Sequence, residues 1–262
     1  MPKIELVGEE RWSTHSVFNS NAFPVGLEPN VEACSTKAAI HLVHLNMVKE
    51  AVKKNYKDFQ KELKLKITSQ YVASLKKSHS DPVIVYYDGL DYLAALYGFL
   101  NSLKSFLDVY ATLICRTIQP SLGKKSFKRG MVGGKRIAGG AVVRWLKGSA
   151  PKTFKNSSKL QRAIENHSNN WITEAVNHRD ILSHQGDIKE MEHMHIILNP
   201  PSYRYPGILP PLMPDGQLVV DYFSELLSKL REFVEESMIL LPNIEMEHIT
   251  FTNFLILGHK NS

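Results

Sequence analysis

The residues best suited to chemistry are concentrated in one decapeptide, from Asn177 to Gly186. Arg179 is followed five positions later by His184, and Asp180 comes directly after the arginine. A guanidinium group presents a planar fork of donors that fits phosphate oxygens. An imidazole exchanges a proton near neutral pH, so it can serve as a base in one step and as an acid in the next. This combination favours proton transfer at a phosphodiester.

The residues before the decapeptide predict that it lies on a helix. Positions 171–176 contain no helix breaker, so the segment is expected to be helical without interruption. Asn170 is expected to cap this helix at its start. Gly186 suits the position just past its end, where a left-handed residue closes the last turn.

Helical spacing then determines which side chains can meet. Asp180 and His184 are four positions apart and share a face, and Arg179 and Ser183 share the neighbouring face. Arg179 and His184 lie about 140° apart around the helix, so only the long arginine side chain lets both reach one ligand. We expect Asp180 to orient the imidazole, with Asn177 and Ser183 supporting it by hydrogen bonds. The alternative is that these residues form only caps and surface ion pairs.

The same residues resemble a family signature. Arg179 to His184, at the end of a predicted helix, resembles the RxxxxH motif of the HEPN superfamily (higher eukaryotes and prokaryotes nucleotide-binding). Leu103 to Asp108 resembles a basic–Ser–x–Leu–Asp stretch on the first long helix of such domains. The resemblance covers residues 85–240. In one subfamily a partner nucleotidyltransferase modifies a tyrosine two positions after the histidine, where this chain has Gly186.

The resemblance implies a mainly α protein with a HEPN-like up-and-down helical bundle. It implies a metal-independent endoribonuclease without a cofactor, acting as a homodimer whose two motif helices face each other. Many members are toxins or antiviral effectors, which implies an antitoxin or regulatory partner, whereas others only bind or scaffold. Arg179 and His184 would be catalytic, with Asp180. Asp108 is expected near the inner face of its helix, where it would hold Arg179 or His184 in place or form a structural ion pair.

The charge distribution indicates a polyanionic partner such as RNA. The chain has 32 basic and 26 acidic residues, a net charge of +6. No acidic residue occurs between Asp108 and Glu165, while this segment holds 13 of the basic ones, so the remainder is net acidic. Such polarity suits a nucleic acid, although a solvated loop without a ligand is the alternative. The expected contacts are Lys124, Lys125, Lys128, Arg129, Lys135, Arg136 and Arg144.

Residues 121–156 are interpreted as a basic insertion that forms a mobile arm. The stretch from Gly130 to Arg136 resembles a phosphate loop, but it lacks the spacing and the hydroxyl that such a loop needs. Phe127 and Trp145 are candidates for stacking on bases. Trp145 could instead anchor the segment to the core.

The composition of the chain bears on membrane insertion, cellular location and metal binding. No apolar run is long enough to span a membrane, so no span is expected. The residues at the start lack the basic-then-apolar form of a secretion signal, so none is expected. The two cysteines, Cys34 and Cys115, are consistent with buried thiols of a reducing compartment, so a cytoplasmic location is expected. His41 with His44, and His193 with His195, lack a third ligand at matching spacing, so no metal site is expected.

The expected organisation is a single elaborated domain with a small β appendage. Residues 1–31 are irregular, residues 32–80 hold an N-terminal helix and a connection, and residues 83–241 form the helical core. Within the core we expect one long helix over 83–118, with a break near Gly89 as the alternative. We also expect a helix capped by Ser157 or Ser158 and a helix that begins at Asp221. A small hairpin is expected between 194–198 and 218–220. Residues 242–262 form a C-terminal strand or arm.

Overall fold

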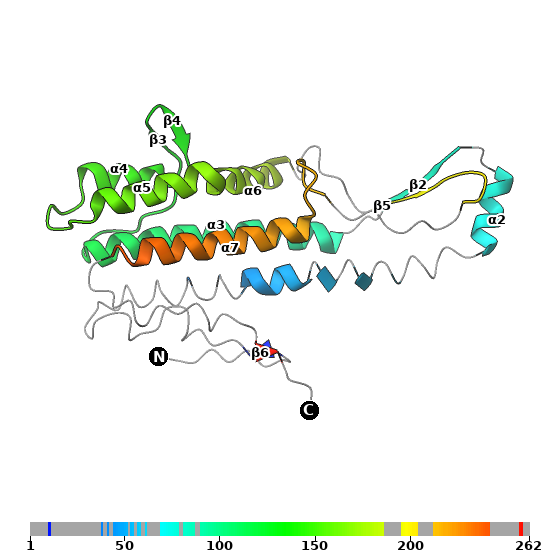
Figure 1. Cartoon of the computed structure of the whole chain (residues 1–262), viewed down its shortest axis with the longest axis horizontal. Helices are drawn as coiled ribbons and strands as arrows, with labels where there is room; N and C mark the ends of the chain where they lie inside the picture. The colour runs from blue at the N-terminus through cyan, green and yellow to red at the C-terminus, as the bar shows by residue number, and fades with distance from the viewer. Residues whose placement is uncertain are drawn as a thin grey trace. The chain divides into compact units, whose positions relative to one another are not determined.

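A computed structural model describes residues 10–11, 38, 41, 44–51, 53–54, 57–58, 61, 69–78, 81–86, 90–185, 195–203, 212–241 and 257–258. This part of the chain is mainly helical, as predicted (Figure 1). The helices are α2 (Ser69–Ser78), α3 (Leu90–Ile118), α4 (Gly140–Gly148), α5 (Ser157–His167), the π-helical turn η3 (Ser168–Ile172), α6 (Thr173–Gln185) and α7 (Val219–Met238). The described residues between 38 and 61 are helical as well.

The strands form three antiparallel pairs. β1 (Glu10–Arg11) pairs with β6 (Leu257–Gly258), β2 (Val83–Tyr86) with β5 (His195–Leu198), and β3 (Gly130–Val132) with β4 (Lys135–Ile137). Only β3 and β4 are neighbours in sequence, and they form the hairpin that projects from α4 and α5 in Figure 1.

Contacts divide the chain into two compact units. The first comprises Met1–Asn46, Leu100–Arg179 and Leu226–Ser262, and the second comprises Met47–Phe99 and Asp180–Glu225. The division falls within α3, α6 and α7. The sequence predicted a single domain, whereas the contacts group into two compact units.

The core of the first unit is built around Phe233 of α7. Its ring meets Tyr110 of α3 edge-on, with centroids 5.6 Å apart, and Phe127 of the basic segment at 5.9 Å. His167 of α5 lies 5.2 Å from the same ring. Aromatic pairs in such geometry stabilise a core beyond their buried area. One side chain on α7 therefore holds three separate segments.

The apolar spacing that predicted α3 is confirmed by burial. Leu103, Phe106, Leu107, Leu113 and Ile114 are all buried, as the helical period requires. The helix ends at Ile118, two residues before Pro120, which lacks the amide proton needed to continue it.

In the second unit, Phe99 stacks on Phe223 with ring centroids 4.0 Å apart and an interplanar angle of 7°. The β2–β5 ladder pairs Val83 with Leu198 and Tyr86 with His195. Tyr203, which follows β5, donates a hydrogen bond of 3.2 Å to the carbonyl of Asp81, which precedes β2, and so closes the Val83–Leu198 end of the ladder.

Two predicted elements were wrong. Residues 83–86 were predicted as helix, but they form β2 because β5 supplies a partner strand distant in sequence. The hairpin predicted between 194–198 and 218–220 does not form, since β5 pairs with β2 and Val219 begins α7. Asp221 accordingly lies within the first turn of α7.

None of the helices that the structure describes is both long and apolar enough to cross a membrane. Gly186, His193 and most of both termini, including residues 249–256, lie outside the described residues.

Candidate functional site

The decapeptide singled out by its chemistry lies on helix α6, as predicted. The boundary between the two units falls inside this helix: the Leu100–Arg179 part of the first unit ends at Arg179, and the Asp180–Glu225 part of the second begins at Asp180. Arg179 and Asp180 are half-buried, whereas Ser183 and His184 are exposed. His184 lies in the last turn of α6, where its imidazole is open to solvent.

The start of this helix differs from the prediction. α5, η3 and α6 follow one another without a break, so Asn170 lies inside a helical run and caps nothing. Its side chain donates to Asn166 Oδ1 at 3.1 Å. Neither Ser157 nor Ser158 caps α5, since the residue at that position is Asn156 and Ser157 donates instead to the Leu146 carbonyl at 2.7 Å.

Helix α6 carries the base of the β3–β4 hairpin. The Arg129 guanidinium donates to Asn177 Oδ1, and the backbone amide of Ala138 donates to Thr173 Oγ1 at 3.0 Å. Thr173 and Asn177 are one helical turn apart, so the two bonds fix both strands of the hairpin to one face of α6. Asn177 was predicted to support the motif residues, and its contact in the structure is to the basic segment.

Glycines allow the hairpin to approach α4 closely. A Cβ on Gly130 would lie 2.7 Å from the carbonyl carbon of Gly140, a distance that requires both residues to lack side chains. Gly139 has φ of 75°, and a Cβ there would meet the Phe127 ring at 2.5 Å. The base of the hairpin is therefore packed backbone to backbone.

Asp108 also serves the basic segment. Its Oδ1 accepts hydrogen bonds from Lys104 Nζ at 2.5 Å and from the Phe127 amide at 2.8 Å. One turn further on, Thr112 Oγ1 donates to the Lys125 carbonyl at 2.5 Å and accepts from the Lys125 amide at 3.2 Å. These contacts attach residues 125–127 to α3. The ion pair with Lys104 confirms the structural alternative for Asp108, and its described contacts do not include Arg179 or His184.

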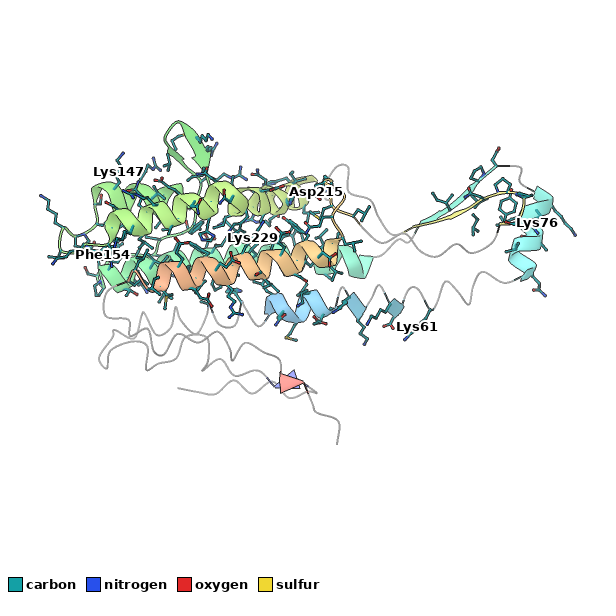
Figure 2. All side chains as sticks on the ribbon, viewed as in Figure 1. Lys61, Lys76, Lys147, Phe154, Asp215 and Lys229 are labelled. Carbon is teal, nitrogen blue, oxygen red and sulfur yellow. The ribbon has the colours of Figure 1, made fainter. Side chains whose placement is uncertain are left out.

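The basic segment presents most of its cations to solvent. Arg116, Lys125 and Arg129 are half-buried. The other ten are exposed, and they are Lys124, Lys128, Lys135, Arg136, Arg144, Lys147, Lys152, Lys155, Lys159 and Arg162. Lys147 is labelled on α4 in Figure 2. We call these ten residues the basic face; no carboxylate occurs within the same 109–164 stretch.

The predicted mobile arm has regular structure, and its predicted stacking residues are not available. Residues 121–156 contain β3, β4 and α4. Phe127 is completely buried against Phe233, so its assignment as a base-stacking residue was wrong. Trp145 is only 7% exposed, which confirms the alternative that it anchors the segment to the core.

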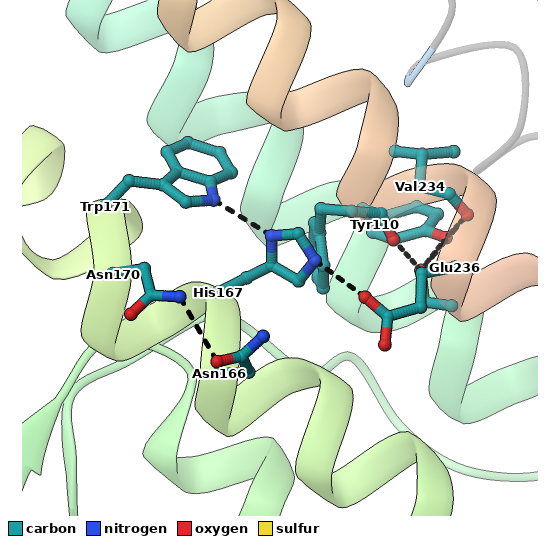
Figure 3. A network of polar contacts seen from close by, with 9 residues as sticks. Tyr110, Asn166, His167, Asn170, Trp171, Val234 and Glu236 are labelled. Carbon is teal, nitrogen blue, oxygen red and sulfur yellow. Dashed lines mark hydrogen bonds and ion pairs between the residues drawn. The ribbon is translucent and has the colours of Figure 1, made fainter.

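A polar network that runs from the buried Trp171 through His167 to the exposed Glu236 was not anticipated (Figure 3). Trp171 Nε1 donates to His167 Nδ1 at 3.0 Å, and His167 Nε2 lies 2.8 Å from Glu236 Oε2. An indole nitrogen is only a donor, so Nδ1 must be unprotonated and Nε2 must carry the proton that goes to Glu236. The sequence signal was a histidine and a tryptophan four positions apart, but the predicted cap at Asn170 assigned them to different helices.

Of the two histidine pairs, only His41 with His44 can be placed, because His193 lies outside the described residues. His44 Nδ1 makes its contact with Ser102 Oγ on α3. Burial, with the nearby His44, lowers the pKa of His41. Among the described residues no three His, Cys, Asp or Glu side chains gather closely enough to hold a metal ion.

Comparison with family models, with curated proteins and with solved structures gives no match for this chain.

Proposed function

We propose that this chain is a HEPN-type, metal-independent endoribonuclease that binds RNA through its basic face and cleaves it with residues of α6. The observation that carries the proposal is the attachment of the basic hairpin to the motif helix, through Arg129 to Asn177 and Ala138 to Thr173. A cationic surface built on the helix that bears Arg179 and His184 would deliver a phosphodiester to those groups.

The proposed reaction begins with attack of a ribose 2′-oxygen on the adjacent phosphorus. His184 takes the 2′-hydroxyl proton as this bond forms, and the bond from phosphorus to the 5′-oxygen breaks. A second imidazole protonates the leaving 5′-oxygen, giving a 2′,3′-cyclic phosphate and a 5′-hydroxyl end. Arg179 stabilises the charge on the phosphorane, and Asp180 orients the histidine.

One histidine and one arginine are too few for this reaction, because base, acid and charge stabilisation are needed together. A homodimer in which two copies of α6 face each other supplies both pairs. This assembly belongs to the proposal, as do the role of toxin or antiviral effector and an antitoxin or regulatory partner.

Incubation of the purified chain with mixed RNA in excess chelator tests the proposal. His184→Ala and Arg179→Ala should each lower cleavage by about 10²–10⁴-fold, the usual contribution of a positioned acid–base or charge-stabilising group. His178→Ala removes an imidazole from the same helix and serves as the matched control, with activity close to wild type. Activity that disappears in chelator, or that persists in both site variants, would overturn the assignment.

A non-catalytic RNA- or nucleotide-binding module is the second candidate. The ten exposed cations of the basic face favour it independently of the motif residues. It predicts RNA affinity that falls steeply with salt, no product, and no effect of His184→Ala on binding. The same incubation separates the two candidates, because only the first yields fragments.

A further inference from the structure

The β3–β4 hairpin is a thin two-stranded ribbon with a cationic surface. Met131 lies directly opposite Arg136, and Val132 lies opposite Lys135. Residues directly opposite each other in an antiparallel pair share a face, so each face of the ribbon carries one cation near the tip. Met131 is 53% exposed, which is unusual for a large apolar side chain.

The ribbon has a fixed base and an open tip. Ile137 is buried, Gly130 packs against the backbone of Gly140, and the base is bonded to α6. At the tip, Gly133 and Gly134 have φ of 54° and 81°, and no atom lies within 4 Å of where their Cβ atoms would be. The tip can therefore approach a ligand closely without a side chain in between.

The exposed groups around this ribbon suit phosphates better than bases. Surfaces that hold single-stranded nucleic acid combine cations with exposed aromatic rings on which the bases stack. Here Tyr110, Phe127 and Trp145 are buried in the core, and Phe154 is half-buried. The ribbon and its flanks present Lys128, Lys135 and Arg136, which recognise a phosphate backbone whatever the bases.

We infer that the hairpin binds the A-form duplex part of a structured RNA, with the ribbon lying across the wide, shallow minor groove and its cations on the flanking phosphates. This inference rests on the proposed function and names its substrate class. A base-paired strand cannot place its 2′-oxygen in line with the leaving 5′-oxygen. Cleavage is therefore expected at unpaired nucleotides next to a stem.

Binding is measured with the full-length chain carrying His184→Ala, so that the RNA stays intact. The probes are an RNA duplex of about 16 base pairs, the span of a typical double-stranded RNA-binding domain, an unstructured single strand with the same number of phosphates, and a DNA duplex of the same sequence. The RNA duplex should bind about tenfold more tightly than the other two, because the A-form shape and the 2′-hydroxyls add to the charge that all three probes share.

A charge-matched pair of variants locates the contact. Lys135→Gln with Arg136→Gln should reduce the salt dependence of duplex binding by about two phosphate contacts and the affinity by about tenfold or more. Lys76→Gln with Lys77→Gln removes the same charge from the exposed surface of α2 and should leave the affinity within about twofold. Thermal unfolding of all variants verifies that each is folded.

Different outcomes would overturn the duplex inference and the proposed function. Equal or tighter binding to the single strand or to the DNA duplex would overturn the inference while leaving RNA binding intact. An equal effect of both double variants would overturn it as well. Failure to bind any of the three probes would instead overturn the proposed function.

Discussion

His167 is buried beside α7, and both nitrogens of its ring have partners. The Trp171 indole occupies Nδ1, so the neutral ring with its proton on Nε2 is the form that satisfies both bonds. The indole is itself only 4% exposed, so bulk solvent has little access to its N–H. The network therefore fixes the side-chain conformation of Trp171 in η3, directly before α6.

Replacing His167 by Ala should lower the free energy of unfolding by about 2–4 kcal/mol, because it opens a cavity and leaves the indole N–H of Trp171 unsatisfied. Ser168→Ala is the neighbouring control. The Ser168 hydroxyl is completely buried and has no hydrogen-bond partner within the described residues. Its removal should cost nothing or stabilise the protein by up to about 1 kcal/mol. Urea unfolding measures both, and equal losses would refute this account of the network.

Cys115 gives a prediction with a defined pH window. Burial raises the pKa of its thiol to about 12, an effect that the charge of Lys125 partly opposes. In the unfolded chain the thiol has a pKa of about 8.5. The free energy of unfolding is therefore unaffected by this thiol below about pH 8.5 and decreases as the pH rises toward 12, because only the unfolded chain ionises in that window.

Between pH 9 and pH 10 the wild type should lose about 1 kcal/mol of unfolding free energy relative to Cys115→Val. Denaturant titrations of the two proteins at each pH give the difference directly. A difference that does not change with pH would show that the thiol ionises alike in the folded and unfolded chain.

At the scale of elements, the hairpin depends on its glycines in different ways. Gly139→Ala should cost about 2–4 kcal/mol, because φ is 75° and the new Cβ would meet the buried Phe127 ring at 2.5 Å. Gly133→Ala also has a positive φ, of 54°, but its Cβ would enter open space, so the expected cost is about 1 kcal/mol. Thermal unfolding compares the stability of the two variants. A larger loss of stability in Gly133→Ala than in Gly139→Ala would contradict the close packing described for the base of the hairpin.

The local periodicity of the sequence was enough to predict helices but not their long-range partners. The apolar spacing on α3 predicted its buried face, and the absence of breakers placed Arg179 and His184 on a helix. Residues 83–86 carry three β-branched residues, yet their conformation depends on a strand more than 100 residues later. The hairpin strands have three residues each, too few for alternation to be visible.

The candidate site was predictable in residue type and less so in contacts. Phe127 had the right chemistry for stacking, and only its packing against Phe233 shows why it cannot do so. Asp108 lay on the expected helix, but its partner amide at Phe127 becomes close only when the basic segment folds back on α3. Such contacts are set by tertiary packing, which no local pattern encodes.

At the scale of the whole molecule, charge is segregated along the chain. The 109–164 segment folds within the first unit and presents ten exposed cations, while the rest of the chain carries an acidic excess. A field of this polarity accelerates association with a polyanion and weakens as salt is added.

The proposed dimer predicts concentration-dependent catalysis. If one copy of α6 supplies the base and the other the acid, specific activity per chain should fall on dilution in parallel with the dimer fraction measured by sedimentation. Adding catalytically inactive His184→Ala chains at fixed wild-type concentration should lower activity further, because mixed dimers lack one imidazole. Constant specific activity through dissociation would show that one copy suffices.

The most direct measurement is the chemical identity of the new RNA ends formed in excess chelator, read by mass spectrometry. The account predicts fragments that end in a 2′,3′-cyclic phosphate and begin with a 5′-hydroxyl, formed by the wild type and lost in His184→Ala. Fragments that end in a 3′-hydroxyl, or cyclic ends that form equally well without the His184 imidazole, would contradict it.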